Sequence, residues 1–253
     1  MKTGRFLRKS YSAKVVSIIT PQVHRVVTAF TRQLFNARMI FVVVESKNAR
    51  WQKTMVEPQL LFEESTHTYT LRREGFADII LPSVTQIMEP LESKAYCGIS
   101  ERIMDTAADR GTRLHRSVEQ FLKYTFRNVD DDCTGYFDGF TKFISNHPDW
   151  KPIHSEFRFY HPALLYAGTC DLLFMTPKGT VLVDLKTTAQ AHKKMWGVQL
   201  AAYQQGIESF DKPLKIAATM VLQVSADGNY ILHDIKTDFS LFLACLQIYG
   251  FSE

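Results

Sequence analysis

Three charged residues in two otherwise apolar segments could do chemistry together. Asp184 and Lys186 lie two apart within residues 180–186, so an extended strand places both side chains on one face. Asp171 precedes Asp184 by thirteen positions and is the one acid of another apolar segment, residues 167–174. Burial of a carboxylate or an ammonium is costly unless the group is paired or bound to a metal. The pattern indicates a metal site or, as the simpler alternative, a structural ion pair at a strand end.

The turn segment 177–179 (Pro-Lys-Gly) joins these two segments and predicts a hairpin. A hairpin brings the carboxylates of Asp171 and Asp184 together, where each raises the pKa of the other unless a cation separates them. Magnesium suits a carboxylate site that retains waters, and phosphate oxygens can complete its shell. A divalent ion beside an ammonium would supply the activated water and the charge stabilisation that phosphodiester hydrolysis needs.

Two further residues could add ligands to such a site. Glu156 lies in a predicted strand, residues 152–160, and could supply a third carboxylate, although a solvated sheet face is the alternative. His115 lies on a predicted helix, residues 101–124, beside its apolar stripe. As a ligand, its imidazole would tolerate manganese as well as magnesium, and the alternative is a partly buried structural histidine.

Residues that could contact a nucleic acid lie on two predicted helices. Gln199 and Tyr203 are four apart, so they share one face of the helix that follows residue 186. The helix over residues 101–124 carries four arginines: Arg102, Arg110, Arg113 and Arg116. These four could line a basic groove, although a solvated helix face is the commoner arrangement.

The elements that would position these residues follow from periodicity. The expected strands are residues 60–63, 68–72, 152–160, 165–175, 180–186, 216–224 and 230–235. The expected helices are residues 84–91, 101–124, 136–144 and 194–210, with a last one beginning near residue 238. Ser83 follows Pro82 and is the expected N-cap of the first helix. The alternation of helices and strands predicts the α/β class.

Composition limits the function classes. Of the 253 residues, 45% are hydrophobic, which is enough for one filled core. No apolar run approaches 18 residues, so the sequence predicts no membrane-spanning helix. The four cysteines are far apart and form no CxxC pair, which argues against a thiolate-held zinc or iron–sulfur site and against a disulfide scaffold. Free thiols in a reducing compartment are the plain interpretation.

Charge is distributed unevenly along the chain. Residues 1–54 hold eleven Lys or Arg against one acid, Glu45, whereas the remainder holds more acids than bases. The basic segment could be a nucleic-acid-binding arm, a dispensable leader before Met55, or a mitochondrial transit segment. The sequence therefore indicates an extension over residues 1–54 and one folded domain over residues 55–253.

Five motifs, in order, resemble those of the PD-(D/E)xK nuclease superfamily, and within it the RecB-like exonuclease branch. They are GTRLH at 111–115, Glu156, GTCD at 168–171, DLK at 184–186 and Gln199 with Tyr203. The lead-in LPSVT at 81–85 also resembles that of phage and mitochondrial genome-maintenance exonucleases in this branch. The resemblance covers about residues 59–235.

The resemblance implies a restriction-endonuclease-like core, with a mixed central β-sheet flanked by helices. It implies that His115, Asp171, Asp184 and the Leu185 carbonyl ligate Mg²⁺ or Mn²⁺, with Glu156 as an additional acidic or water-mediated ligand. Lys186 would orient and help deprotonate the attacking water. The residues expected to contact DNA are Gln199, Tyr203, Arg113 and Ser83. No cysteine cluster follows residue 203, so no iron–sulfur cluster is expected.

The expected function is that of a metal-dependent DNA exonuclease in repair, recombination or replication. Its partner would be DNA, single-stranded or end-processed duplex, and no membrane. The sequence has no GxxxxGK[ST] motif, so a helicase, recombinase or single-strand-binding partner would do any unwinding. A cytoplasmic location, bacterial or phage-encoded, is expected, or a mitochondrial one if the basic segment is a transit peptide. The alternative is a catalytically silent nuclease fold that only binds nucleic acid.

Overall fold

The computed structural model describes residues 57–95, 98, 100–209 and 214–251. The chain divides into the units Met1–Thr54 and Met55–Glu253, and the description that follows concerns the second. The basic extension predicted over residues 1–54 lies outside the described residues.

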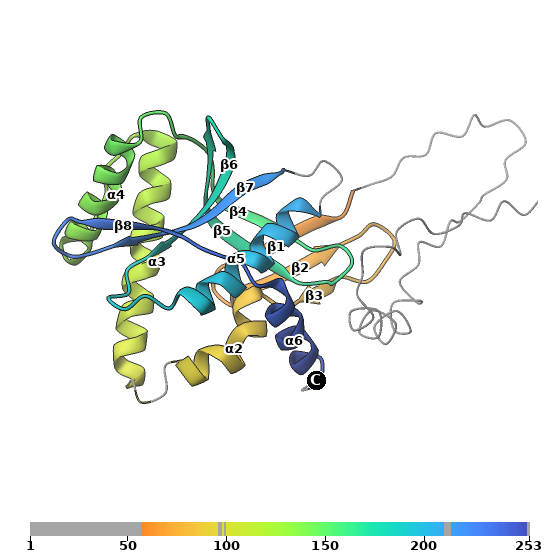
Figure 1. Cartoon of the computed structure of the whole chain (residues 1–253). Coiled ribbons are helices and arrows are strands. Elements are labelled where there is room, and N and C mark those ends of the chain that lie inside the picture. The colour runs from red at the N-terminus through yellow and green to blue at the C-terminus, as the bar shows by residue number, and fades with distance from the viewer. Residues whose placement is uncertain (1–56, 96–97, 99, 210–213, 252–253) are drawn as a thin grey trace, which may run out of the picture. The chain divides into compact units, whose positions relative to one another are not determined.

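Two sheets and five α-helices make up the described part of this unit (Figure 1). The first sheet contains β1 (Gln59–Glu63), β2 (Thr68–Arg72) and β3 (Ile79–Leu81). The second contains β4 (Lys151–Tyr160), β5 (Ala167–Thr176), β6 (Gly179–Lys186), β7 (Ile216–Val224) and β8 (Tyr230–Asp234). The helices are α2 (Val84–Ala95), α3 (Glu101–Tyr124), α4 (Thr134–Asn146), α5 (Lys193–Glu208) and α6 (Phe239–Tyr249), with a 3₁₀ turn at Asp131–Cys133.

The larger sheet has the spatial order β4-β5-β6-β7-β8 and is mixed. Strands β6 and β7 run parallel, and every other neighbouring pair is antiparallel. A parallel pair needs a crossover connection, and α5 supplies it between β6 and β7. The expected α/β class, with a mixed central sheet flanked by helices, is therefore confirmed.

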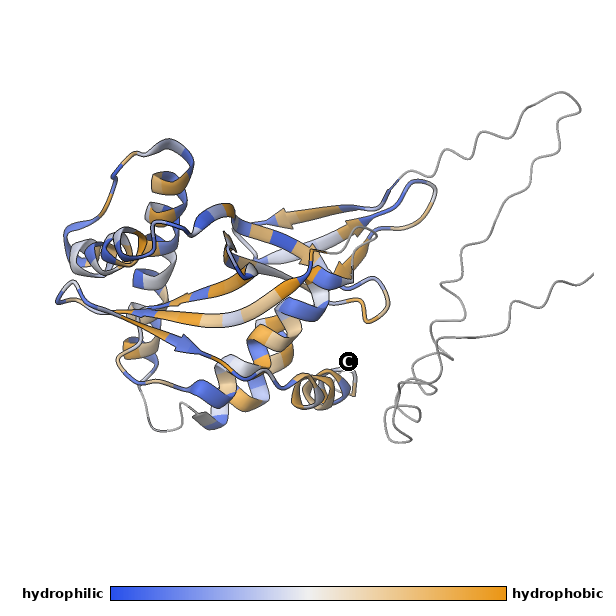
Figure 2. Cartoon of the chain, turned by 45° about the horizontal axis from the view of Figure 1, so that its top comes forward, coloured by the Kyte–Doolittle hydropathy of each residue, from blue (hydrophilic) through white to orange (hydrophobic). Residues whose placement is uncertain are grey.

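Helices cover both faces of this sheet. Neighbouring residues of a strand point to opposite faces, so each packs against a different set of helices. Leu182 of β6 packs in one apolar cluster with residues of α2, α5 and α6, among them Trp196. Its neighbour Val183 packs in a second cluster with residues of α3 and α4, among them Phe140. Figure 1 shows the two helical layers, and Figure 2 shows the apolar residues of the strands between them.

The start of α2 is fixed by a capping box and tied to β5. The amide of Gln86 donates to Ser83 Oγ (3.1 Å), and the Ser83 amide donates to Gln86 Oε1 (2.8 Å). The amide of Ala167 donates to the carbonyl of Pro82 (2.9 Å), which holds this cap against the first residue of β5. The prediction that Ser83 caps this helix is confirmed.

Most expected elements occur with bounds shifted by a residue or two, and two differences have physical reasons. Strand β5 begins at Ala167 rather than residue 165, because Leu165 has a φ of 54°, outside the extended region. Strand β3 was not expected, since three residues are too few to show a period. Among the described residues, no helix is both long and apolar enough to span a bilayer.

Candidate metal centre

Asp171 of β5 has no paired residue in the ladder with β6 or in the ladder with β4. On one side the β5–β6 ladder ends at Leu172 and Val183, so the two strands separate beyond that pair. The amide of Leu185, which is then free of β5, donates instead to Asp171 Oδ2 at 2.7 Å. The carboxylate therefore fills the gap that opens between the strands, and its position is fixed by a backbone donor.

His115 reaches this gap from α3. Its Nε2 lies 3.1 Å from the Leu185 carbonyl oxygen, which can only accept, so Nε2 carries the proton. Its Nδ1 lies 3.4 Å from Asp171 Oδ1 and 3.5 Å from Glu156 Oε1. A histidine that binds a metal usually donates its other ring N–H to a carbonyl or carboxylate in this way. The Leu185 carbonyl, expected as a ligand, is occupied here in orienting the imidazole.

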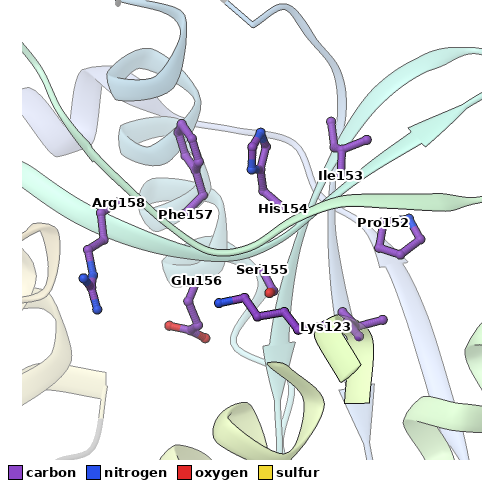
Figure 3. Close-up of a pocket in the computed structure, with 9 residues that line it drawn as sticks. Lys123, Pro152, Ile153, His154, Ser155, Glu156, Phe157 and Arg158 are labelled. Atoms are coloured by element: carbon purple, nitrogen blue, oxygen red, sulfur yellow. The ribbon is translucent and has the colours of Figure 1, made fainter. Parts of the chain in front are cut away.

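Glu156 reaches the same place from the edge strand β4 through an unusual backbone conformation. Its φ of 51° is outside the extended region, and the β4–β5 ladder passes from Ser155–Leu172 to Phe157–Cys170 without an intervening pair. In Figure 3, Glu156 points to one side of β4, while Phe157 points to the other. Such strain is frequent at functional sites, where the surrounding structure must hold it.

These three residues offer one ligand atom each, and the three atoms lie within 4.8 Å of one another. Carboxylate oxygens with an imidazole nitrogen suit Mg²⁺ or Mn²⁺, and the imidazole also tolerates softer divalent ions. When His115 is neutral, its Nδ1 and the two carboxylate oxygens present three electron pairs to one another, an arrangement that a bound cation stabilises. The donor set therefore fits the metal that the sequence predicted.

Asp184 and Lys186 lie on the same face of β6, as predicted, and lead away from the cluster towards α5. The Lys186 ammonium lies 2.8 Å from Asp184 Oδ2 and donates to Gln199 Oε1 at 3.1 Å. The Gln199 amide nitrogen donates to the Tyr203 hydroxyl at 2.9 Å. Because Gln199 and Tyr203 share a face of α5, this row of contacts continues along that helix and fixes the position of the ammonium.

One oxygen of this row has an unused bonding capacity. Asp184 is only 2% exposed, and its Oδ2 accepts no well-aligned hydrogen bond within the described part of the chain. The Lys186 ammonium, 2.8 Å away, is the charge partner of this oxygen, and a carboxylate oxygen can accept from more than one donor. A buried carboxylate oxygen in this state is an expected ligand for a cation.

The pKa values of the acids reflect burial and mutual charge. Burial raises the pKa of Asp184 to about 6; the charge of Lys186 opposes this shift and that of Asp171 adds to it. Burial also raises the pKa of the Glu156 carboxyl. At Asp171 burial opposes ionisation, but the charges of His115 and Lys186 outweigh it and lower the pKa. Burial opposes the charge on His115 too, and the two neighbouring acids still hold its pKa well above the usual value. The cluster thus favours a positive charge at its centre.

A single cavity of about 390 Å³ brings most of the predicted site residues together. The predicted residues that line it are Ser83, His115, Glu156, Asp171, Asp184, Lys186, Gln199 and Tyr203. Gly168 also lines it, and a Cβ there would lie 2.8 Å from Phe159 and 3.2 Å from Tyr203. The absence of a side chain at Gly168, the first residue of the motif GTCD, therefore allows α5 to approach β5 closely enough to place Tyr203 at the cavity.

Arg113 is not brought to this cavity. Its guanidinium instead pairs with Asp109 (2.9 Å), Asp130 (2.9 Å) and Asp132 (2.6 Å), which ties α3 to the 3₁₀ turn before α4. These pairs occupy the donors that DNA contact would need, and that role stays a prediction. Of the other three arginines of α3, Arg116 lines the cavity.

Several cavity residues were not singled out by the sequence. Phe62, His67 and Tyr69 come from β1, β2 and the turn between them, and Arg158 comes from β4. Alternation in β1 and β2 indicates only strands, so no local signal relates Phe62, His67 and Tyr69 to a site some hundred positions further along the chain. Arg158 lies two positions from Glu156 on one strand, so the strand period does relate it to the site. A comparison of the chain with protein-family models found no match, and a search of curated proteins found none either.

Proposed function

We propose that this protein is a Mg²⁺- or Mn²⁺-dependent deoxyribonuclease of the PD-(D/E)xK type, with a restriction-endonuclease-like core, acting as an exonuclease. The observation that carries the proposal is the cavity in which the His115–Glu156–Asp171 cluster and the Asp184–Lys186 pair lie together. Its charged groups are those that phosphodiester hydrolysis needs. The mixed sheet with helices on both faces is the architecture that the sequence resemblance implies.

His115, Glu156 and Asp171 would hold the cation, with Asp184 Oδ2 as a further donor. When bound, the cation would lower the pKa of water and offset charge on phosphate oxygens. The Leu185 backbone orients two of these ligands at once, since its amide binds Asp171 and its carbonyl binds His115. One peptide position of β6 thus sets the geometry of ligands from β5 and α3.

Lys186 would act on the reacting phosphate rather than on the cation. Its ammonium is held between Asp184 and Gln199, so its charge is fixed in place before substrate binds. There it would orient the attacking water and stabilise negative charge that develops on the phosphate oxygens. Gln199 and Tyr203 would contact DNA next to that phosphate, because both line the same cavity.

The test is a cleavage assay with the full chain on end-labelled linear single- and double-stranded DNA and on a circle, in Mg²⁺, Mn²⁺ and EDTA. We expect metal-dependent degradation of linear DNA that is lost in Lys186→Ala and Asp184→Asn, with folding checked by circular dichroism. Arg127→Ala, which changes an arginine that pairs with Asp138 outside the cavity, is the matched control. DNA binding without cleavage in any metal, or full activity in Lys186→Ala, would overturn the proposal.

A further inference from the structure

The cavity that holds the candidate metal centre has a second wall, made of planar side chains. Phe62 of β1, Tyr69 of β2, His67 of the intervening turn and Arg158 of β4 all line it. This wall is contributed mainly by the small sheet, whereas the ligands and Lys186 come from the large sheet and α3. A molecule in the cavity would therefore meet both the charged groups and these flat side chains.

Contacts among these side chains make the wall a built surface. The rings of Phe62 and His67 are 5.2 Å apart and nearly perpendicular (89°), and those of Phe62 and Tyr69 are 4.6 Å apart. The guanidinium carbon of Arg158 lies 4.8 Å from the centroid of the Phe62 ring. The hydroxyls of Tyr69 and Thr169 are 2.8 Å apart, which ties the wall to β5.

Two polar members of the wall, His67 and Arg158, remain accessible to a ligand. Tyr69 is buried, Phe62 is half-buried, and His67 and Arg158 are exposed. Arg158 forms no ion pair with the acids of the described ranges, so its charge is not neutralised by an acid there. In Figure 3, Arg158 points to the same side of β4 as Glu156, which places it on the side of the metal centre.

The chemistry of this wall fits a nucleobase. A base offers flat faces that stack on aromatic rings and on guanidinium planes, and this contact tolerates any base. A cavity of about 390 Å³ is within the range for small-ligand sites, so it has room for a nucleotide. We propose that Phe62, His67 and Arg158 form a stacking subsite for an unpaired nucleobase next to the scissile phosphate.

This inference rests on the proposed nuclease function and specifies its substrate. A base in a duplex is already paired and stacked, and freeing it costs free energy that a single strand does not require. The subsite therefore selects single strands, or ends that have been unwound, over intact duplex. The positive charge of Arg158 also favours the phosphate that joins the stacked nucleotide to the next one.

The test measures binding of a single-stranded oligonucleotide that carries the fluorescent base 2-aminopurine, with the full chain in an Asp184→Asn background, so that cleavage does not interfere. We expect quenching of the fluorophore on binding, as stacking requires. Phe62→Leu keeps an apolar side chain for folding and removes the ring, and it should weaken binding on the order of tenfold. Phe62→Tyr keeps the ring and should bind as the parent protein does.

The protein contains a matched control for this Arg–Phe contact. Arg73 lies over the ring of Phe76 at 5.1 Å, next to the same small sheet but outside the cavity. Phe76→Leu should leave binding and quenching unchanged. Arg158→Lys retains the charge and removes the plane, so it should reduce quenching more than it reduces the salt dependence of binding.

Binding and quenching that are equal in the parent protein and in folded Phe62→Leu and Arg158→Lys would overturn the subsite. So would a preference for duplex over single strand that Phe62→Leu leaves unaltered. Failure of the nuclease proposal is a separate result, because it is measured in the protein with Asp184 intact as an absence of metal-dependent cleavage. Cleavage by that protein with no effect of the Phe62 variants would reject the subsite and retain the nuclease.

Discussion

His115 and Arg113 are two residues apart on α3, yet the charged clusters around them differ in their surroundings. Arg113 meets three acids whose side chains are well exposed, 59% in the case of Asp130. His115 meets Asp171, whose side chain is 11% exposed, and Glu156. In both clusters acids outnumber bases. Water and salt screen the excess negative charge around Arg113. The excess negative charge around His115 is buried, is screened much less, and therefore favours a bound cation.

The largest difference between the clusters should appear in catalysis. Lys186→Ala removes the one ammonium held against Asp184 and should lower the cleavage rate by about 10³-fold, the scale found when a fixed electrostatic group is removed from an active site. Arg113→Ala should change the rate by less than about threefold at low salt, since exposed pairs contribute little. Single-turnover cleavage of linear DNA measures both. Comparable losses in the two variants would show that the clusters are not functionally distinct.

The next largest effect should be the dependence of metal affinity on pH. The pKa of Asp184 is raised to about 6, so this carboxyl takes up a proton as the pH falls through that value. Protons compete with metal for the His115 imidazole, whose pKa is raised well above its usual value, so the apparent affinity for Mn²⁺ should already decrease as the pH falls towards 6. Below about 6, protonation of the Asp184 carboxyl should add a further loss of up to about tenfold for each pH unit. Calorimetric titrations over a pH series on both sides of this value measure it. An affinity that does not vary over the series would contradict the role of Asp184 as a donor.

Without metal, the Asp184 carboxyl should make the fold less stable as the pH rises, whereas an acid in an ordinary ion pair, with a lowered pKa, makes it more stable. A carboxyl whose pKa is raised on folding stabilises the fold below its unfolded value near 3.8, and this contribution is lost as the pH rises through about 6. In EDTA, the free energy of unfolding of wild type should therefore fall by about 3 kcal/mol relative to that of Asp184→Asn as the pH rises from 3.8 to about 6. Urea unfolding of both proteins at several pH values measures the difference. A constant difference would mean that Asp184 titrates normally.

A smaller effect is expected from the backbone contact that orders the buried cluster. Asp171→Ala leaves the Leu185 amide without its acceptor and should lower the free energy of unfolding by about 1–3 kcal/mol. Asp171→Asn retains an acceptor oxygen and should cost less. Thermal melts in EDTA compare the two variants. Equal stability of Asp171→Ala and wild type would show that the carboxylate does not organise the gap between β5 and β6.

The smallest effect belongs to the exposed cluster. Asp132→Asn removes one of three acids at Arg113, and its shift in Tm should be slight at low salt and vanish near about 1 M salt. Differential scanning calorimetry at the two salt concentrations is the measurement. A shift that persists at high salt would mean that the cluster is shielded from solvent as the buried one is.

The sequence was informative where local pattern and chemistry coincide. Alternation in β6 predicted that Asp184 and Lys186 share a face, and the 2.8 Å contact between them confirms it. The helical spacing of Gln199 and Tyr203 likewise predicted that they share a face of α5, where the structure shows them hydrogen-bonded to each other. In each case the two residues lie on one element, so its period alone sets their relation.

What the sequence could not predict depends on long-range packing. The positive φ of Glu156 and the early end of the β5–β6 ladder follow from contacts between elements, and no local pattern encodes them. The same holds for the planar wall, since Phe62 and Arg158 are 96 positions apart in the chain. Arg113 shows the same limit: the four arginines of α3 suggested a basic groove, but the acids at 130 and 132 that pair with Arg113 lie outside that helix, and no helical period reveals them. A DNA contact by Arg113 stays a prediction.

The most direct test is equilibrium binding of Mn²⁺ to the full chain, followed by the loss of the free-ion signal in electron paramagnetic resonance. Three proteins are compared: wild type, Asp171→Asn in the buried cluster and Asp132→Asn in the exposed one. We expect saturable binding in wild type and in Asp132→Asn, and its loss in Asp171→Asn. Equal binding by wild type and Asp171→Asn would contradict the assignment of the buried acids as a metal centre.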